Sequence, residues 1–274
     1  MKTIYYYQTF VGLDKLMSHT HDIDVINISS IHFDEDKHGN KNIYLNDNLP
    51  NDPKFNIMWE QTQLLGEQGI TIMLMVGGAG GAYTNLFLDF ETYYPLLRKL
   101  LQDKTYISGV DLDIEETVSL VNVKKLINLL KKDFPFIQIS MAPVASAMIT
   151  DSPGLGSFSY KELYNSVEGN HIDSFNVQCY DSFSYETFRR IIKNDYPPEK
   201  INMGMMSGQF TKDTFNEALQ EIHSTLITYP KMGGVFDWEY LDAPPVKNDP
   251  SQWCKLMKDV EDNRWSQNSD TILE

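Results

Sequence analysis

The sequence is short of cysteine and of positive charge. It contains 2 cysteines, and its 23 Lys and Arg stand against 38 Asp and Glu, which gives a formal net charge of −15. Cys179 and Cys254 lie far apart, in a strand-like and a helix-like run, so we expect no disulfide framework. The negative charge argues against nucleic acids and anionic membranes as partners, because both attract basic surfaces. A neutral polysaccharide meets no such repulsion.

Long hydrophobic runs, internal repeats and low-complexity tracts are also missing. No segment approaches the roughly 20 apolar residues that a membrane span needs. Met1–Phe10 lacks the features of a signal peptide, so we expect either an intracellular protein or a secreted one that has already been processed. The remaining composition, 42% hydrophobic and 22% charged over 274 residues, is typical of a soluble globular protein.

Eight short β-rich runs alternate with helix-length stretches. The runs are Lys2–Tyr7, Val25–Ile31, Ile70–Val76, Gly109–Glu115, Ile137–Val144, Ser174–Tyr180, Ile201–Met206 and Gly233–Trp238. Amphipathic stretches lie between them at Phe87–Leu101, Val121–Leu130 and Phe215–Ile227. Strands that alternate with helices pair in parallel, and eight such units favour a closed barrel. We therefore predict an α/β fold, a single (β/α)8 TIM barrel over residues 1–274 without a large inserted domain, with a tail at 265–274 that frays.

Three connections bear on the face where barrels of this kind build their sites. Asp34–Pro53 and Ala145–Ser159 are long, rich in turn residues, and follow the second and fifth predicted strands. Ser207–Thr211, after the seventh strand, is short. It leaves no room for an inserted domain that would wall a tunnel, so we expect an open groove.

The most informative segment is 108–115, Ser-Gly-Val-Asp-Leu-Asp-Ile-Glu. Side chains of a strand alternate between its faces, so Asp111, Asp113 and Glu115 would share one face at spacings of about 7 Å. Carboxylates this close inside a fold cannot all ionise freely, and at least one pKa should be raised. A carboxylic acid with a raised pKa beside an ionised carboxylate is the usual means of cleaving a glycosidic bond. The alternative, an edge strand with a solvated polar face, fits the aliphatic opposite face less well.

Two later strands end in polar and aromatic side chains. Asn176, Gln178 and Tyr180 alternate with apolar residues on the sixth run and should point into the barrel. Phe236 and Trp238 share a face of the last run, whereas the opposite face carries a charge, at position 237, with no evident partner. Catalytic residues of barrels come from the carboxyl ends of several strands, and an indole there offers a flat floor for a sugar ring.

The segment Gly109–Glu115 resembles the D-G-x-D-x-D-x-E signature of glycoside hydrolase family 18, the chitinases and endo-β-N-acetylglucosaminidases. Further motifs resemble the family in the same order along the chain, at Gly77-Gly78, Met141-Ala142-Pro143, Gln178-Cys179-Tyr180-Asp181 and Gly233–Trp238. Two positions depart from it. Ser108 stands where the signature has its first Asp, and Met75 stands where the family has a Ser before Gly-Gly.

The resemblance implies a retaining mechanism in which the substrate supplies the nucleophile. Glu115 would act as general acid and then as general base, with Asp113 orienting the acetamido N–H and Asp111 sharing a proton with Asp113. Tyr180 would bind the acetamido carbonyl. The implied substrate-binding residues are Trp238, Gln178, Asp181, Met141, Gly77 and Gly78. No metal and no cofactor is implied, and the six histidines are scattered without ligand spacing.

We therefore expect a glycosidase, a chitinase-like endo-hydrolase that acts as a monomer on chitin or chito-oligosaccharides containing N-acetylglucosamine. An endo-β-N-acetylglucosaminidase acting on N-linked glycans is the alternative enzyme; it would keep the same catalytic residues and differ in loops such as Asp34–Pro53. A lectin-like relative that binds sugar without cutting belongs to another class, although such relatives commonly lose the acid that stands here as Glu115. A storage or structural barrel that binds no sugar is a third possibility.

Overall fold

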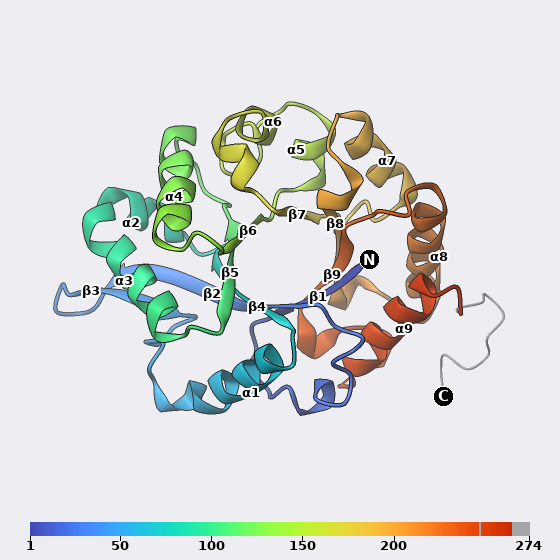
Figure 1. The fold of residues 1–274 in the computed structure, drawn as a ribbon, viewed down its shortest axis with the longest axis horizontal. Coiled ribbons are helices and arrows are strands. Elements are labelled where there is room, and N and C mark those ends of the chain that lie inside the picture. Colours follow the sequence, from blue (N-terminus) through green and yellow to red (C-terminus); the bar gives the residue numbers. More distant parts are fainter. Residues whose placement is uncertain (247, 265–274) are drawn as a thin grey trace.

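A closed barrel of parallel strands, ringed by helices, dominates the computed structural model, which describes residues 1–246 and 248–264 (Figure 1). The strands are β1 (Lys2–Tyr7), β2 (Val25–Glu35), β3 (Lys41–Leu45), β4 (Thr71–Gly77), β5 (Ile107–Asp113), β6 (Gln138–Met141), β7 (Ser174–Gln178), β8 (Ile201–Met206) and β9 (Gly234–Trp238). The helices are α1 (Asn56–Glu67), α2 (Ala82–Leu88), α3 (Phe90–Asp103), α4 (Leu120–Asp133), α5 (Ala145–Ile149), α6 (Tyr160–Tyr164), α7 (Tyr185–Lys193), α8 (Lys212–Thr228) and α9 (Ser251–Glu261).

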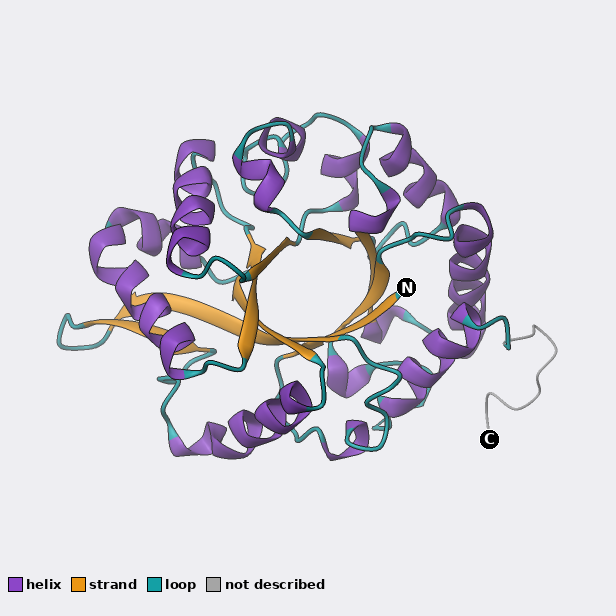
Figure 2. Ribbon diagram, in the orientation of Figure 1, coloured by secondary structure: helices purple, strands orange, loops and turns teal. Residues whose placement is uncertain are grey.

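The sheet closes because β1 pairs in parallel with both β2 and β9. The order runs β1-β9-β8-β7-β6-β5-β4-β2, and β3 adds an antiparallel strand to the outer part of β2. Figure 2 shows the strands as a ring with the helices outside it. The predicted (β/α)8 barrel is confirmed. That residues 1–274 form one domain stays a prediction, and the tail at 265–274 lies outside the described residues.

Alternation along each strand separates two layers of packing. Val110, Leu112 and Ile114 join the large apolar cluster between the barrel and its helices. The inner face of the barrel carries a small separate cluster with Tyr6 and Phe236 at its centre. The outer layer holds most of the buried apolar area, so the interior is free to carry polar groups at its upper end.

The segment Asp34–Pro53, expected to be a loop, is largely a β-hairpin. β2 continues to Glu35 and β3 pairs with it, matching Ile31 to Leu45 and Phe33 to Ile43. These four side chains are buried, and they alternate with exposed or half-buried polar residues. The polar composition concealed this period of two, which is the mark of a strand with one buried face.

Several other boundaries differ from expectation. The helix predicted over Phe87–Leu101 is two helices, because the backbone of Asp89, between α2 and α3, leaves the helical region at φ −137° and ψ 66°. The Ala145–Ser159 connection begins with the short helix α5. The strands predicted to end at Glu115 and Tyr180 end two residues earlier, at Asp113 and Gln178.

Both cysteines are buried free thiols. Within the described residues, every helix falls short of the length and apolar character that crossing a bilayer requires. The connection after β8 is short, as predicted, because only residues 207–211 separate that strand from α8.

Candidate active site

The deepest polar group of the site is the carboxylate of Asp111, which is fully buried inside the barrel. Tyr6 Oη donates to its Oδ2 at 2.8 Å, and Asn176 Nδ2 donates to its Oδ1 at 3.0 Å. Ser140 Oγ makes a short hydrogen bond to the same Oδ1. Burial raises the pKa of Asp111 to about 6, and the three hydrogen bonds act in the opposite direction by stabilising the ionised form.

Asp113 lies one step higher on the same face and has a different environment. It is 6% exposed, and among the described side chains its donor is the amide of Gln178, at 3.2 Å from its Oδ1. Burial first, and then the charges of Glu115 and Asp111, hold the pKa of Asp113 well above its ordinary value. Of the two buried carboxyls, Asp113 is therefore the one that carries a proton, since Asp111 has more donors for its charge.

Glu115 follows the end of β5 and is half-buried at the mouth of the barrel. Gln178 Nε2 donates to Glu115 Oε1 at 3.1 Å and also contacts the Ala142 carbonyl at 2.9 Å. One amide thus links Glu115 to Asp113 and is itself held by the backbone after β6. The alternation predicted for the 108–115 segment is confirmed by these contacts.

Tyr180 and Trp238 border the carboxyl groups. Tyr180 packs edge-on against Phe236, with ring centroids 6.4 Å apart, and its pKa is raised, by burial most of all and then by the nearby carboxyls of Asp113 and Glu115. Its phenol is therefore a neutral hydrogen-bond donor at physiological pH. Trp238 is half-buried, and its ring lies 5.5 Å from that of Tyr6.

The residue that follows the indole holds the neighbouring loop in place. Glu239 accepts hydrogen bonds from the backbone N–H groups of Gln8 and Thr9, and from Thr9 Oγ1 at 2.6 Å. These contacts fix the loop after β1 beside Trp238. The charge at position 237, for which the sequence offered no partner, is a fully buried Asp237 that accepts a hydrogen bond from Ser207 at 2.6 Å. Burial raises the pKa of Asp237 well above its ordinary value.

The glycine pair at 77 and 78 shapes the backbone around Asp113. Gly77 has φ +101° and Gly78 has φ +82°, a region that favours glycine. A Cβ at Gly77 would lie 2.2 Å from the carbonyl oxygen of Asp113 and 2.5 Å from the ring of Tyr83. The Gly78 N–H donates to that same carbonyl at 2.9 Å. This pair lets β4 approach the end of β5 without a side chain between them.

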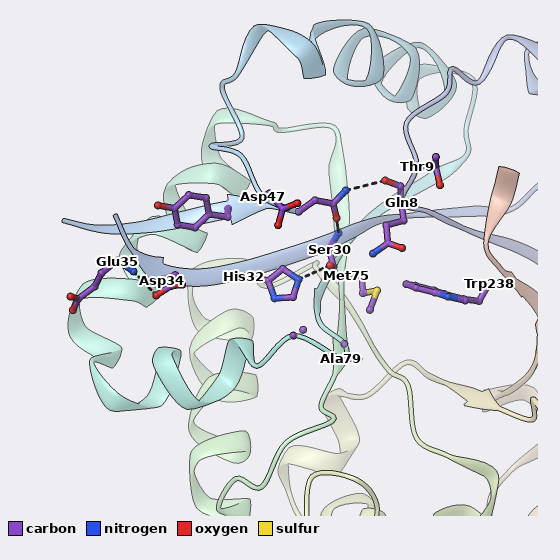
Figure 3. A pocket seen from close by; sticks show the side chains of 15 residues that line it. Gln8, Thr9, Ser30, His32, Asp34, Glu35, Asp47, Met75, Ala79 and Trp238 are labelled. Atoms are coloured by element: carbon purple, nitrogen blue, oxygen red, sulfur yellow. Dashed lines mark hydrogen bonds between the residues drawn. The ribbon is translucent and has the colours of Figure 1, made fainter. Parts of the chain in front are cut away.

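A cavity of about 800 Å³ extends from Trp238 and the glycine pair along β2 to the β2–β3 hairpin. Figure 3 shows Trp238 at one end and Glu35 at the other, with His32 and Met75 between them. The lining side chains are mostly polar: Gln8, Thr9, Ser30, His32, Asp34, Glu35, Tyr44, Asn46 and Asp47. The groove that we expected is therefore lined on one side by the hairpin.

Sequence reasoning missed most of this lining. The signal was present in the alternation of Ser30, His32 and Asp34 with Ile31 and Phe33, which marks one polar face of a longer β2. His32 Nε2 lies 2.7 Å from Ser30 Oγ. Partial burial lowers the pKa of His32 despite nearby carboxylates, so the ring is neutral at physiological pH.

One predicted substrate-binding residue lies elsewhere than expected. Met141 is fully buried in the outer apolar cluster, because its partner in the sheet, Leu112, faces outward. The inward residue of that strand is Ser140, so Met141 has no access to the groove and its assignment was wrong. Asp181 is exposed on the loop after β7.

The structure shows where the two residues that depart from the family motifs lie. Ser108 is exposed near the start of β5, and its hydroxyl donates to the Ile72 carbonyl at 3.4 Å. It lies at the opposite end of that strand from Glu115. Met75 is buried in the inner cluster, and a Cβ at Gly78 would lie 2.9 Å from its terminal methyl.

Comparisons with known proteins agree with this geometry. Neither a family model nor a curated protein sequence matches the chain. A solved fungal endo-β-N-acetylglucosaminidase from glycosyl hydrolase family 18 is 29% identical with a TM-score of 0.85, over 95% of this chain and 98% of that one. The chitinase ChiC from Aspergillus fumigatus is 27% identical with a TM-score of 0.81, over 94% and 98% of the two chains. The resemblance to glycoside hydrolase family 18 is confirmed.

A family 18 chitinase from Pseudoalteromonas aurantia, 19% identical with a TM-score of 0.71, covers 95% of this chain and 100% of its own, and shares the fold. The two more similar structures are both glycan-cleaving enzymes, which supports the expectation that this chain is a glycosidase.

Replacing Gly77 by Ala should damage both stability and the site. We expect a loss of about 3 kcal/mol or more in the free energy of unfolding, because the left-handed backbone costs roughly 1–2 kcal/mol and the new methyl group also clashes with Asp113 and Tyr83. Gly39→Ala is the matched control, since Gly39 has φ +78° with nothing within 4 Å of a new Cβ. It should cost only about 1 kcal/mol. Urea denaturation of both variants measures the difference, and equal losses would contradict the close approach of β4 to β5.

Proposed function

We propose that the chain hydrolyses the β-1,4 bond that follows an N-acetylglucosamine unit, by a retaining mechanism in which the acetamido group of the substrate is the nucleophile. The observation that carries this proposal is the ladder of Asp111, Asp113 and Glu115, which rises from a buried carboxylate with three hydrogen-bond donors to a half-buried one at the mouth of the barrel. Such an arrangement places a carboxyl group at its upper end, where a glycosidic oxygen would lie.

The first half of the reaction uses Glu115 as the acid. It would protonate the glycosidic oxygen while the bond from that oxygen to the anomeric carbon breaks and the acetamido oxygen bonds to the same carbon. The product is a cyclic oxazolinium ion with a positive charge next to Asp113. Asp113 would pass its proton to Asp111, accept a hydrogen bond from the acetamido N–H as a carboxylate, and so stabilise that charge. Tyr180 would donate to the acetamido oxygen. The short path from Glu115 through Gln178 to Asp113 supports this division of roles.

The second half reverses the roles. Water would attack the anomeric carbon from the side that the leaving sugar vacated, and the Glu115 carboxylate would take up its proton. Two inversions at one carbon give net retention. Trp238, half-exposed at the end of the cavity, would support the sugar ring whose acetamido group reacts. The polar wall along β2 would bind further sugar units through their hydroxyl groups.

Chitin or a chito-oligosaccharide is the substrate that we expect first, because the groove lined by the hairpin has room for several sugar units of one kind. An endo-β-N-acetylglucosaminidase acting on N-linked glycans is favoured by a different observation, the likeness to the fungal enzyme of that activity. Both reactions use the same acid and the same acetamido nucleophile. The substrate class, and not the chemistry, distinguishes them.

Glu115→Gln should abolish hydrolysis and preserve binding, because the amide keeps the shape of the side chain but has no proton to donate. We expect a loss of at least about a thousandfold in kcat/KM. Hydrolysis of chito-oligosaccharides and of a high-mannose glycopeptide is measured for both proteins, with Glu60→Gln, an exposed position on α1, as the control for the same chemical change. Cleavage of the glycopeptide alone would assign the N-glycan activity. Wild-type protein that binds chitin oligomers and cuts neither substrate would be a lectin.

The assisted mechanism makes a separate prediction about inhibition. A thiazoline derived from N-acetylglucosamine mimics the cyclic intermediate, so it should compete with substrate and bind the wild-type enzyme at least about a hundredfold more tightly than the parent sugar does. Inhibition constants for the thiazoline and for N-acetylglucosamine measure the ratio. Equal affinities would exclude an oxazolinium intermediate even if hydrolysis is observed.

Removing a donor from Asp111 should move the acidic limb of the pH–rate profile. Tyr6→Phe deletes one of the three hydrogen bonds to this carboxylate, so its pKa should rise above the value of about 6, by about one unit. The pair of Asp111 and Asp113 would then take up its second proton at higher pH. As pH falls, activity should therefore be lost earlier in the variant than in the wild type.

Tyr7→Phe provides the control for that change. The next residue of β1 is equally buried but faces outward, where its hydroxyl accepts a hydrogen bond from the Gly12 N–H. Its pH profile of kcat/KM should follow the wild type. An acidic limb that stays in place in Tyr6→Phe would separate Asp111 from the catalytic protonation.

A further inference from the structure

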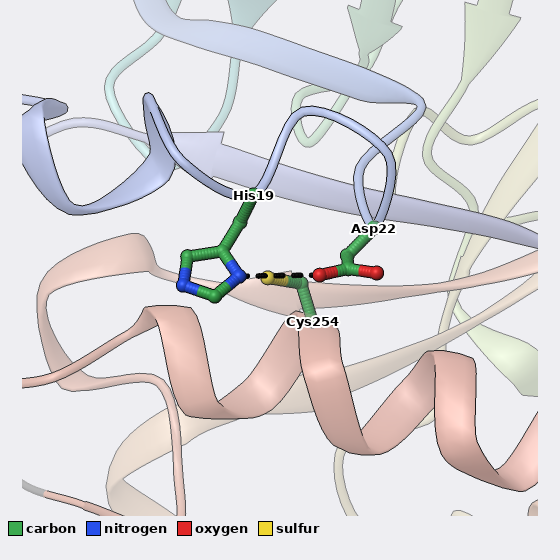
Figure 4. Close-up of side chains that lie close together, drawn as sticks. All are labelled: His19, Asp22 and Cys254. Atoms are coloured by element: carbon green, nitrogen blue, oxygen red, sulfur yellow. Dashed lines mark hydrogen bonds and ion pairs between the residues drawn. The ribbon is translucent and has the colours of Figure 1, made fainter.

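Three side chains of metal-ligand type meet outside the barrel wall, on the opposite face of β1 from the catalytic carboxyls. His19 and Asp22 belong to the connection between β1 and β2, and Cys254 lies in the first part of α9. Figure 4 shows their nitrogen, oxygen and sulfur atoms pointing toward one another. The contacts of β1 show that the cluster lies on its outer face. The Tyr5 hydroxyl accepts a hydrogen bond from the Cys254 N–H, whereas the neighbouring Tyr6 points inward and donates to Asp111.

The spacing of these atoms is close to that of a coordination shell. All three ligand atoms lie within 4.8 Å of one another, and His19 Nδ1 is 3.1 Å from Asp22 Oδ2. Zinc binds sulfur at about 2.3 Å and nitrogen or oxygen at about 2.0–2.2 Å, so tetrahedral ligands lie roughly 3.3–3.7 Å apart. A shift of about 1 Å in these side chains would bring the sulfur into this range.

Burial and charge fit the same occupant. Cys254 is fully buried, while the side chains of His19 and Asp22 are 23% and 25% exposed. A cation held here would have three protein ligands and one position open to solvent. A thiolate and a carboxylate together neutralise a divalent ion, and the donor set of nitrogen, oxygen and sulfur suits Zn²⁺ better than Mg²⁺ or Ca²⁺, which select oxygen.

We propose that His19, Asp22 and Cys254 form a binding site for a thiophilic divalent cation, of which Zn²⁺ is the best fit. The site joins the connection after β1 to the helix after β9, and β1 and β9 are the strands whose pairing closes the barrel. A bound ion would therefore fasten the N-terminal and C-terminal parts of the fold together. Its role is stabilising and does not depend on the proposed hydrolysis.

The resting thiol is hydrogen-bonded. Cys254 Sγ donates to the Ser251 carbonyl at 3.1 Å. A cation must displace that proton, because the thiolate is the ligand.

Cobalt reports directly on the sulfur ligand. Co²⁺ added to chelator-treated, full-length protein should produce a near-ultraviolet band from charge transfer between thiolate and cobalt, saturating at one equivalent, and Zn²⁺ should displace it. Cys254→Ala should abolish the band. Cys179→Ala is the matched control, because that thiol is equally buried but is not part of the cluster, and it should leave the band intact. Surface carboxylates bind cobalt without this band, so they do not interfere.

Two further variants and a stability measurement complete the test. His19→Ala and Asp22→Asn, both partly exposed, should each weaken Co²⁺ binding at least tenfold, and they decide the question if Cys254→Ala fails to fold. Zn²⁺ at about a hundredfold excess over its dissociation constant should raise the melting temperature of the wild type by about 5 °C and that of His19→Ala by about half as much or less. No band in the wild type, or a band unaffected by His19→Ala and Asp22→Asn, would overturn the proposal.

Discussion

The constraint on which the site depends is a carboxylate buried at the centre of the barrel. An isolated charge there would be very costly, and the fold offsets this cost with donors from three other strands: Tyr6 on β1, Ser140 on β6 and Asn176 on β7. Asn202 on β8 donates in turn to the amide oxygen of Asn176 at 2.7 Å, which turns the amide nitrogen of Asn176 toward Asp111. Half of the strands of the barrel are therefore tied to one acid group on β5.

This arrangement decides where protons reside higher in the ladder. Asp111 has its hydrogen-bonding needs met and can keep its charge. Asp113 has one weak donor, and burial first, then the charges of Glu115 and Asp111, raise its pKa and drive it to the neutral form. Gln178 connects it to Glu115. The polar contacts at the bottom of the barrel thus contribute to the protonation of Asp113 above them. Met75 and Phe236 belong to the apolar cluster on the inner face of the barrel, which keeps the dielectric low there.

The sequence predicted the parts of this site that follow from strand periodicity. The alternation in 108–115 correctly assigned three carboxyls to the inner face, and the same rule placed Gln178 and Tyr180. Met141 matches a family motif but lies on the outer face, because strand periodicity assigns Ser140 to the inner face. Contacts between distant strands could not be predicted this way. Tyr6 was seen only as part of a strand, because nothing in its neighbours reveals a partner 105 residues away.

The cluster of His19, Asp22 and Cys254 could not be predicted from the sequence either, because it also depends on contacts between distant segments. Local spacing between His19 and Asp22 is too common to indicate a ligand pair, and Cys254 joins them only because the barrel closes and brings α9 back to β1. Barrel closure thus creates two polar centres on opposite faces of β1, one at Tyr6 on the inner face and one at Tyr5 on the outer face. Since both depend on the position of β1, a change that stabilises the seam between β1 and β9 should also hold Tyr6 against Asp111. The closing strand thereby couples the stability of the fold to the electrostatics of the carboxyl cluster inside the barrel.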